Sequence, residues 1–483
     1  MMALLLAGCI RLGPDHERPE LPLPADITTL PAAPELAAFD VDERWWQRFE
    51  DPLLDALVQE AVTRNFDVAA AVARIRQARA LRGVARGQGL PFLDADFAGS
   101  RQRGSTNAGA LGLPPGLPIP VEQNIFELGL SASWELDVFG RIARRVEAAD
   151  ARIEVAEEDR NGLLLMVVAD TVQNYAELRA AQAQRAIAME NVDSTSRTLE
   201  LTTLLVEGDL SPEFDLVRAR AELRAVEAEV FPFEAQIRAN SAALAELTGR
   251  LPTEIIGRLI EPTPLPPIEG VLPTGMPSEL LRRRPDIRLA ERTLAAETAD
   301  VGAEIADLYP RFNLMGMFGF SALSLDLLFD SGSDVFSFGG AVNWPIFNGG
   351  QLRAEIEEAK AGREEARALY SAAVLGAFRD VDEALTAYVF ADRERTVLAE
   401  TVADRERALE LARLRFEQGL DSLIVLLETQ RQLTAARSAL AASDRTLLVA
   451  TVGVYRALGG GWQAALEERK MAENEVEERV ASE

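Results

Sequence analysis

The sequence contains a large internal repeat, and this duplication constrains the fold more than any other feature of its 483 residues. Four stretches of the first half recur in the second, at offsets of 219, 210, 211 and 211 residues: 65–68 as 284–287, 134–140 as 344–350, 208–211 as 419–422, and 247–249 as 458–460. A repeat of this length is one large unit that occurs two times, not an array of small modules. The content of that unit therefore decides both fold and function.

The composition excludes several classes of function. The chain holds 50 lysines and arginines against 77 aspartates and glutamates, and the net charge of −27 argues against nucleic acid or anionic headgroups as partners. One cysteine and one histidine exclude a disulfide scaffold and leave too few ligands for a metal site built on them. No apolar run reaches about 18 residues, so the chain could enter a membrane only as strands.

The single cysteine ends the tetrapeptide Leu6-Ala7-Gly8-Cys9, which resembles a bacterial lipobox. Cys9 would then be the mature N-terminus and carry acyl chains, and residues 1–8 would be the remnant of a signal peptide. The alternative is a buried cysteine that packs as a small hydrophobe. Ile10, in place of an aspartate, favours the outer membrane. The proline-rich residues 9–51 predict an extended arm, and no cofactor is expected besides the covalent lipid.

Each repeat is expected to open with a helix, at 52–88 and 277–308, followed by a β-hairpin, at 92–137 and 312–347. In the hairpins apolar and polar residues alternate with the period of a strand. The apolar positions expected to face lipid are Phe126, Leu128, Leu130, Trp134, Leu136, Phe336, Phe338, Val342 and Trp344. Half-buried strands of a soluble sandwich would alternate in the same way.

Strand length and number separate these two readings. Four strands of about 10 residues match what crossing a bilayer requires, but a closed barrel needs about eight strands. Several chains must therefore contribute to one barrel. Residues 104–122 and 322–334, rich in Gly, Pro, Ser and Asp, are expected to be the loops of the hairpins.

A helical pattern without proline follows each hairpin, at 142–206 and 352–416. At 1.5 Å per residue, each helix would be roughly 97 Å long, which is too long for a globular core. The four-three spacing of alanine and other apolar residues predicts coiled-coil packing. Each rod ends at a glycine-containing turn and returns through a shorter helix, at 212–248 or 422–458. The long helical hairpins are thus expected at 142–248 and 352–458.

Three smaller predictions complete the domain organisation. The first repeat is expected at 52–250 and the second at 277–462, joined by a proline-rich crossover at 251–276. The acidic tail at 463–483 is expected to be disordered or frayed. Asp170 and Asp380 are repeat equivalents within the long helices, and the sequence allows either a polar lumen or ordinary solvated positions for them.

Several motifs occur in a recognisable order: Gly13-Pro14-Asp15, Trp45-Trp46, Trp134-Glu135-Leu136-Asp137-Val138-Phe139-Gly140-Arg141, Arg284-Pro285-Asp286 and Phe347-Asn348-Gly349-Gly350. From about residue 6 to 462, the chain resembles the TolC-like outer-membrane efflux family, in its lipoprotein branch (OprM/NodT-like) that serves resistance-nodulation-division pumps. The resemblance implies an α+β membrane protein with a duplicated unit. Three chains would form a 12-stranded β-barrel, four strands from each, that continues into a long α-helical coiled-coil barrel.

The resemblance also implies a function and partners. The homotrimer would be a lipid-anchored exit duct in the bacterial outer membrane, with its helical domain in the periplasm. It would passively conduct drugs or other small molecules received from a periplasmic adaptor (membrane fusion protein) and an inner-membrane pump. The alternatives are a channel for a different exporter and a non-conducting trimeric envelope fibre, whose strands would occur once rather than in each repeat. An enzyme is disfavoured, because the sequence has no phosphate loop, nucleophile elbow or histidine-based constellation.

The family pattern for the periplasmic gate is an apolar residue, an acidic residue five positions on, and a basic residue three beyond that. Leu423, Glu428 and Arg431 match it, and Val425 stands where some relatives have a second acid. Three copies of Leu423 would form a constriction, while Glu428 and Arg431 can pair within or between chains. The alternative is an ordinary surface pair beside a core leucine. The residues expected to contact the adaptor are Gly208, Asp209, Leu210, Ser211, Gly419, Leu420, Asp421 and Ser422.

Overall fold

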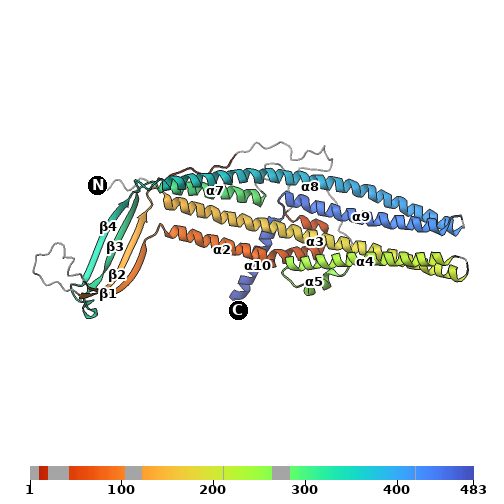
Figure 1. Cartoon of the computed structure of the whole chain (residues 1–483), viewed down its shortest axis with the longest axis horizontal. Coiled ribbons are helices and arrows are strands. Elements are labelled where there is room, and N and C mark those ends of the chain that lie inside the picture. Colours follow the sequence, from red (N-terminus) through yellow and green to blue (C-terminus); the bar gives the residue numbers. More distant parts are fainter. Residues whose placement is uncertain are drawn as a thin grey trace, which may run out of the picture. The chain divides into compact units, whose positions relative to one another are not determined.

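The computed structural model describes residues 10–19, 43–103, 122–209, 211–263, 283–418 and 420–482 (Figure 1). The chain divides into two compact units. One comprises Met1–Pro19, Ile75–Val155 and Ala290–Tyr370, and the other comprises Glu20–Arg74, Ala156–Leu289 and Ser371–Glu483. Among the described residues, no helix has the length and apolar character that a bilayer crossing requires.

A single antiparallel sheet contains all four strands of the described chain, in sequence order (Figure 1). Its members are β1 (Phe92–Arg103), β2 (Glu122–Leu136), β3 (Arg311–Ala322) and β4 (Asp334–Asn343). The two expected hairpins are therefore joined through β2 and β3. The expectation that the last strand continues to residue 347 was wrong, because β4 ends at Asn343, two residues before Pro345, which has no N–H for a ladder.

The helices of the two repeats have equal lengths. The long helices α3 (Arg141–Glu207) and α8 (Gln351–Glu417) have 67 residues each. The returning helices α4 (Glu213–Leu247) and α9 (Leu423–Ala457) have 35 residues each. The helices before the hairpins, α2 (Phe66–Gly87) and α7 (Pro285–Ala306), have 22 residues each.

These bounds simplify the internal repeat. The offset is 219 from α2 to α7 and from β1 to β3, and it is 210 from α3 to α8 and from α4 to α9. The whole difference of nine residues therefore arises between the paired strands of each hairpin. The offset of 211 for the turns was wrong. The left-handed residues that follow α4 and α9, Gly249 (φ 64°) and Gly459 (φ 71°), are 210 apart.

The first opening helix is interrupted, contrary to the expectation of one helix over 52–88. α1 (Pro52–Arg64) ends at Asn65, whose side-chain oxygen accepts hydrogen bonds from the backbone N–H groups of Asp67 (2.9 Å) and Val68 (3.2 Å). Asn65 therefore caps α2 and starts a new helix. In the second repeat, residues 277–282 of the expected helix lie outside the described chain, and α7 begins at Pro285.

The core of the unit that contains α1 is built on aromatic residues. Trp45 and Trp46 lie in the short helix η1 (Trp45–Phe49) and are almost fully buried. The Trp45 ring stacks on Tyr455 with 4.7 Å between centroids, and the Tyr175 hydroxyl donates a hydrogen bond to the Asp51 carboxylate. Residues of α1, α3, α4, α8 and α9 contribute to this cluster, as do residues of three further helices of the same unit.

Two segments are more ordered than the sequence suggested. The expected crossover contains the helix α5 (Pro252–Leu259), which buries Ile255 and Leu259. The expectation of a disordered or frayed tail was wrong, because α10 (Trp462–Ser482) is a helix. Its first turn buries Ala464 and Ala465 in the aromatic core, so apolar packing there outweighs the acidic composition of the rest.

Candidate functional site

The sheet has one continuous apolar face, because residues that pair directly across strands share a face. The pairs on this face include Phe97↔Leu128, Leu128↔Phe320, Leu130↔Phe318, Trp134↔Leu314, Leu136↔Phe312, Phe318↔Phe336, Gly316↔Phe338 and Phe312↔Val342. Phe126 belongs to the same face through its pair with Ala322. The residues expected to face lipid thus lie together, except Trp344, which follows the end of β4.

Small and polar residues predominate on the opposite face, which also carries Met315 and Met317. Ser131 pairs with Asp94 on one side and with Met317 on the other, and its hydroxyl donates a hydrogen bond to Asp96 (3.4 Å). Gly129 and Gly319 pair directly, and a Cβ added to Gly319 would lie 2.4 Å from the Leu128 carbonyl oxygen. The sheet is therefore amphipathic in the sense that the alternation of the sequence predicted.

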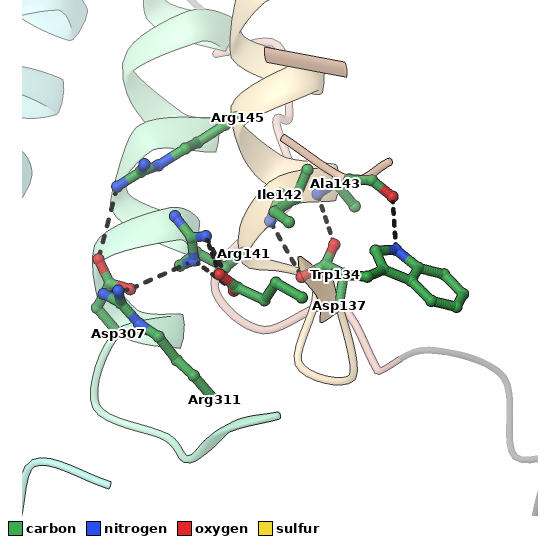
Figure 2. A network of polar contacts seen from close by, with 10 residues as sticks. Trp134, Asp137, Arg141, Ile142, Ala143, Arg145, Asp307 and Arg311 are labelled. Carbon is green, nitrogen blue, oxygen red and sulfur yellow. Dashed lines mark hydrogen bonds and ion pairs between the residues drawn. The ribbon is translucent and has the colours of Figure 1, made fainter. Parts of the chain in front are cut away.

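An ion-pair network joins the end of β2 to the start of α3 (Figure 2). The Asp137 carboxylate accepts hydrogen bonds from the backbone N–H groups of Ile142 (3.0 Å) and Ala143 (2.7 Å), which satisfies two orphan donors of the helix terminus. Arg141 donates to both oxygens of Glu135. These contacts fix the angle at which the chain leaves the sheet and enters the rod.

Asp307 connects this junction to the second repeat (Figure 2). Its buried carboxylate lies 2.7 Å from Arg311, 3.6 Å from Arg145 and 3.7 Å from Arg141. Three guanidinium groups thus surround one carboxylate, and they come from β3 and α3. A buried charge with several partners resists displacement, since removing them would leave it uncompensated.

Two tryptophans make the same contact in the two repeats. The indole N–H of Trp134 donates to the Gly89 carbonyl (3.0 Å), and that of Trp344 donates to the Leu308 carbonyl (3.1 Å). Both carbonyls belong to the short segment before a strand of the same repeat. Tryptophan with one apolar and one hydrogen-bonded edge is typical of a membrane–water interface.

The described part of the N-terminal arm, residues 10–19, is attached to the unit that holds the sheet. Arg144 of α3, only 2% exposed, donates hydrogen bonds to the carbonyls of Leu12 (2.9 Å) and Gly13 (3.3 Å) and to Asp15 (2.8 Å). Gly13 has φ 88°, and a Cβ there would lie 2.4 Å from the Cα of Gly302. No pattern in the sequence predicts this attachment. The expected acylation site, Cys9, lies outside the described residues.

At the start of α9, Glu428 and Arg431 form an exposed ion pair, as their spacing predicted. The Gln432 amide donates to Glu428 (2.9 Å), and Arg405 of α8 donates to the Gln432 oxygen. The hydrogen bonds from Arg431 and Gln432 lower the pKa of Glu428. Leu423 is the first residue of α9, and its side chain lies outside the described part of the chain.

The turns at the ends of the rods are exposed. Asp209 has φ 57°, which favours a short polar residue there, and the Ser211 hydroxyl donates to Asp215 (2.7 Å). In the second repeat Asp421 pairs with Arg415 (2.6 Å) and Leu420 is largely exposed. Gly208 and Ser422 border α3 and α9, whereas Leu210 and Gly419 lie outside the described residues.

The family follows from a comparison over most of the chain. A model of the outer membrane efflux protein family matches residues 57–250 and 276–460. The chain belongs to this family. Nodulation protein T of Rhizobium leguminosarum bv. viciae is 33% identical over 465 residues, 96% of this chain and 93% of the relative. The solvent efflux pump outer membrane protein SrpC of Pseudomonas putida is 30% identical over 485 residues, 96% of this chain and 98% of the relative.

The fold of this outer membrane efflux protein has solved counterparts. The outer-membrane channel OprN superimposes with a TM-score of 0.85 at 35% identity, and the match covers 94% of this chain and 100% of that channel. The resemblance drawn from the sequence motifs is confirmed, as are the duplicated fold and the outer-membrane location. The family is one of efflux ducts rather than of enzymes. The described residues contain no cluster of metal-ligating side chains.

Sequence reasoning missed a polar clasp that is equivalent in the two repeats. The Asn65 amide donates to the Leu247 carbonyl (3.2 Å) at the end of α4, and Arg284 donates to the Ala457 carbonyl (2.9 Å) at the end of α9. Asn65 and Arg284 are 219 residues apart, as α2 and α7 are. The signal that could have revealed the clasp was their shared place in the repeated motif, although the residue types differ.

Arg284 of this clasp also forms an ion pair with Asp380. Arg284 donates to Asp380 (3.0 Å), and Arg379 pairs with the other oxygen (2.9 Å). Burial alone would raise the pKa of Asp380, but the hydrogen bonds from Arg379 and Arg284 lower it. For Asp170 the direction is opposite, because burial raises its pKa more than Arg456 lowers it. The two repeat equivalents have therefore diverged in their environments.

Proposed function

We propose that this protein is the outer-membrane exit duct of a tripartite efflux system. It passively conducts drugs or other small molecules from an inner-membrane resistance-nodulation-division pump and a periplasmic adaptor to the exterior. The observation that carries the proposal is the amphipathic sheet, with two hairpins from two repeats and a single apolar face. The efflux function of the family and the name of the Pseudomonas putida relative support it.

Oligomerisation follows from the number of strands. Four strands cannot close around a passage, whereas three chains would contribute twelve. With the apolar face toward lipid, the face that carries Asp96, Ser131 and Met317 lines the passage. The strands occur in both repeats rather than once at one end, which disfavours a non-conducting fibre.

The ends of the rods are the proposed contact region for the adaptor, at Gly208–Ser211 and at Gly419–Ser422, because they are the exposed turns between paired helices. The gate is proposed at Leu423, Glu428 and Arg431 near these turns. The hydrogen bond from Arg405 of α8 to Gln432 of α9 supports it, since opening would have to separate helices that such contacts hold together.

The N-terminal arm is proposed to be a lipid tether. Cys9 would carry the acyl chains, and the attachment of residues 10–19 through Arg144 would hold the arm next to the sheet. Acyl chains on Cys9 would then enter the membrane at the interface that Trp134 and Trp344 indicate. The acyl chains would then add to the anchoring that the strands provide.

Single-channel recording tests the proposed function. Protein purified from membranes, with the mass of its N-terminal peptide checked for lipid on Cys9, is added to a planar bilayer. Discrete conductance steps are expected from assembled trimers and not from chains dissociated by heat. Assembled trimers that insert into the bilayer without any conductance step, both as wild type and with the gate weakened by Leu423→Ser and Glu428→Ala, would contradict the duct and favour the fibre.

A further inference from the structure

The sheet has two edges at which no described strand is paired. β1 pairs only with β2, and β4 pairs only with β3. In the isolated chain the edge strand β4 leaves Phe336 69% exposed, Phe338 78% exposed and Val342 63% exposed. An unpaired edge beside a large apolar face is a template for another strand.

The internal repeat relates the two hairpins residue by residue. In the first hairpin Phe92 pairs with Ser133, and in the second Arg311 pairs with Asn343. Adding 219 to the first strand and 210 to the second converts Phe92 to Arg311 and Ser133 to Asn343. The offsets that align the helices therefore also align the strand registers.

The same operation can be applied to the ladder between the repeats. In β2 and β3, Leu130 pairs with Phe318 and Ser131 pairs with Met317. This ladder joins the second strand of one repeat to the first strand of the next repeat. In a closed ring, the equivalent ladder joins β4 of one chain to β1 of the neighbouring chain. Its register follows by adding 210 to the β2 residue and subtracting 219 from the β3 residue.

We propose that β4 pairs with β1 of the next chain in the register that places Gly340 opposite Gly99. The antiparallel ladder runs from Phe336 opposite Arg103 to Asn343 opposite Asp96, and the inference rests on the proposed trimeric channel. The partner at each edge is a second copy of this chain. Each chain offers one β4 edge and one β1 edge, so the contact is head-to-tail and closes a ring.

The faces of the strands are consistent with this register. It places Val342 opposite Phe97 on the apolar face and Ala341 opposite Ala98 on the other face. A slip by one residue would turn every apolar side chain of β4 toward the polar face of the neighbouring chain. The offsets carry the two faces of each strand along with its residues, so this agreement is what the internal repeat requires.

A slip by two residues keeps the parity, so the strand ends must discriminate against it. In the proposed register Phe338 lies opposite Arg101 and Phe336 lies opposite Arg103. Each aromatic ring can therefore contact a guanidinium group of the next chain. A two-residue slip in either direction removes one of these two contacts.

Cysteine cross-linking in membranes tests the register. Directly opposed residues have Cα atoms about 4.5–5.5 Å apart, within disulfide range, whereas diagonal neighbours at roughly 7–8 Å lie outside it. The variant Ala341→Cys with Ala98→Cys tests the polar face, and Val342→Cys with Phe97→Cys tests the apolar face. Cys9 is retained so that delivery is unchanged, and the single-cysteine variants report any coupling to it.

The matched slipped variants combine Ala341→Cys with Ser100→Cys or with Asp96→Cys. After mild oxidation, the in-register pairs are expected to convert the monomer band to a covalent trimer that a reductant reverses, while the slipped pairs stay largely monomeric. Faster trimer formation by a slipped pair would overturn the register and leave the trimer intact. Failure of every pair, together with chains that sediment as monomers after extraction in mild detergent, would overturn the register and the proposed channel together.

Discussion

At the scale of single residues, Arg144 attaches the N-terminal arm to the rest of its unit. Its guanidinium is nearly buried and serves two backbone carbonyls and the Asp15 carboxylate at once. Arginine suits this task because its planar group presents five donors in a fixed geometry, which the lysine ammonium does not. The arm is also held by ion pairs of Arg11 with Glu147 (3.9 Å) and of Arg18 with Glu291 (3.5 Å), and Arg144 is the contact that reaches its backbone carbonyls.

Replacing Arg144 by alanine is expected to release the arm. A hydrogen bond from a charged group contributes about 1.5–3 kcal/mol, so the thermal unfolding midpoint should fall and the peptide bonds of residues 10–19 should become sensitive to protease. Arg144→Lys should recover only part of the loss. Arg152→Ala is the control, since Arg152 is half-exposed on the same helix and pairs with Asp300. Equal effects of Arg144→Ala and Arg152→Ala would show that the contacts with the arm are unimportant.

A second prediction at this scale concerns pH. Burial on α7 raises the pKa of Glu304 above its ordinary value of 4.5, and Asp307, Glu355 and Asp300 raise it further against the opposing Arg145. The folded chain therefore binds this proton more tightly than the unfolded chain. The ionised group is destabilising at neutral pH, and the penalty disappears as the pH falls through the raised pKa.

Glu304→Gln should accordingly raise the unfolding temperature at pH 7, and its advantage should shrink as the pH approaches 4.5. Thermal unfolding measured across this range checks the expectation. Glu383→Gln, at an exposed position of α8, is the matched control for the loss of one glutamate charge. An advantage of Glu304→Gln that stays constant with pH would contradict the assigned cause.

At the scale of elements, the strands and long helices could be predicted from the sequence because each has its own periodicity and clear ends. Pro91 precedes β1 and Pro310 precedes β3 at the offset of 219, so the same residue type ends each preceding helical segment. The interruption at Asn65 was missed because the helical pattern continues across it. The start of α10 was missed because composition was averaged over an acidic segment whose first turn is apolar.

The two faces of the sheet predict different responses to a charge. Leu130→Arg, on the apolar face near the strand centre, should cost about 2–4 kcal/mol if that face meets lipid. Ser133→Arg, on the other face of the same strand, should be milder and should change the conductance instead. Denaturant unfolding in lipid vesicles and single-channel recording measure the two effects. Equal destabilisation by both variants would refute the orientation of the sheet.

At the scale of the whole molecule, the contacts between segments far apart in the chain could not be predicted. The hydrogen bonds of Arg144 to the arm and of Arg284 to Ala457 join residues 129 or more positions apart, and no periodicity indicates them. The pairing of β2 with β3 likewise depends on how two repeats meet. The gate residues were located by resemblance to the family, not by physical reasoning on the sequence.

The gate predicts a change in the resting state of the channel. Leu423→Ser combined with Glu428→Ala should raise the resting conductance of the isolated trimer several-fold, because both changes weaken contacts of the closed state without altering the sheet. Single-channel recording on assembled trimers measures this. Glu410→Ala is the control, since Glu410 forms an exposed pair with Arg407 at the same spacing on α8. Unchanged conductance in the double variant would place the gate elsewhere.

The equal lengths of the repeated elements carry a consequence for how such a chain can change over evolutionary time. The two halves differ at most positions, yet helices of 67, 35 and 22 residues each occur as a matched pair. Selection has therefore tolerated exchange of amino acids far more readily than gain or loss of one. Among the described elements, the difference of nine residues between the two offsets lies within the hairpins. The two halves have therefore kept the lengths of these helices more strictly than the identities of their residues.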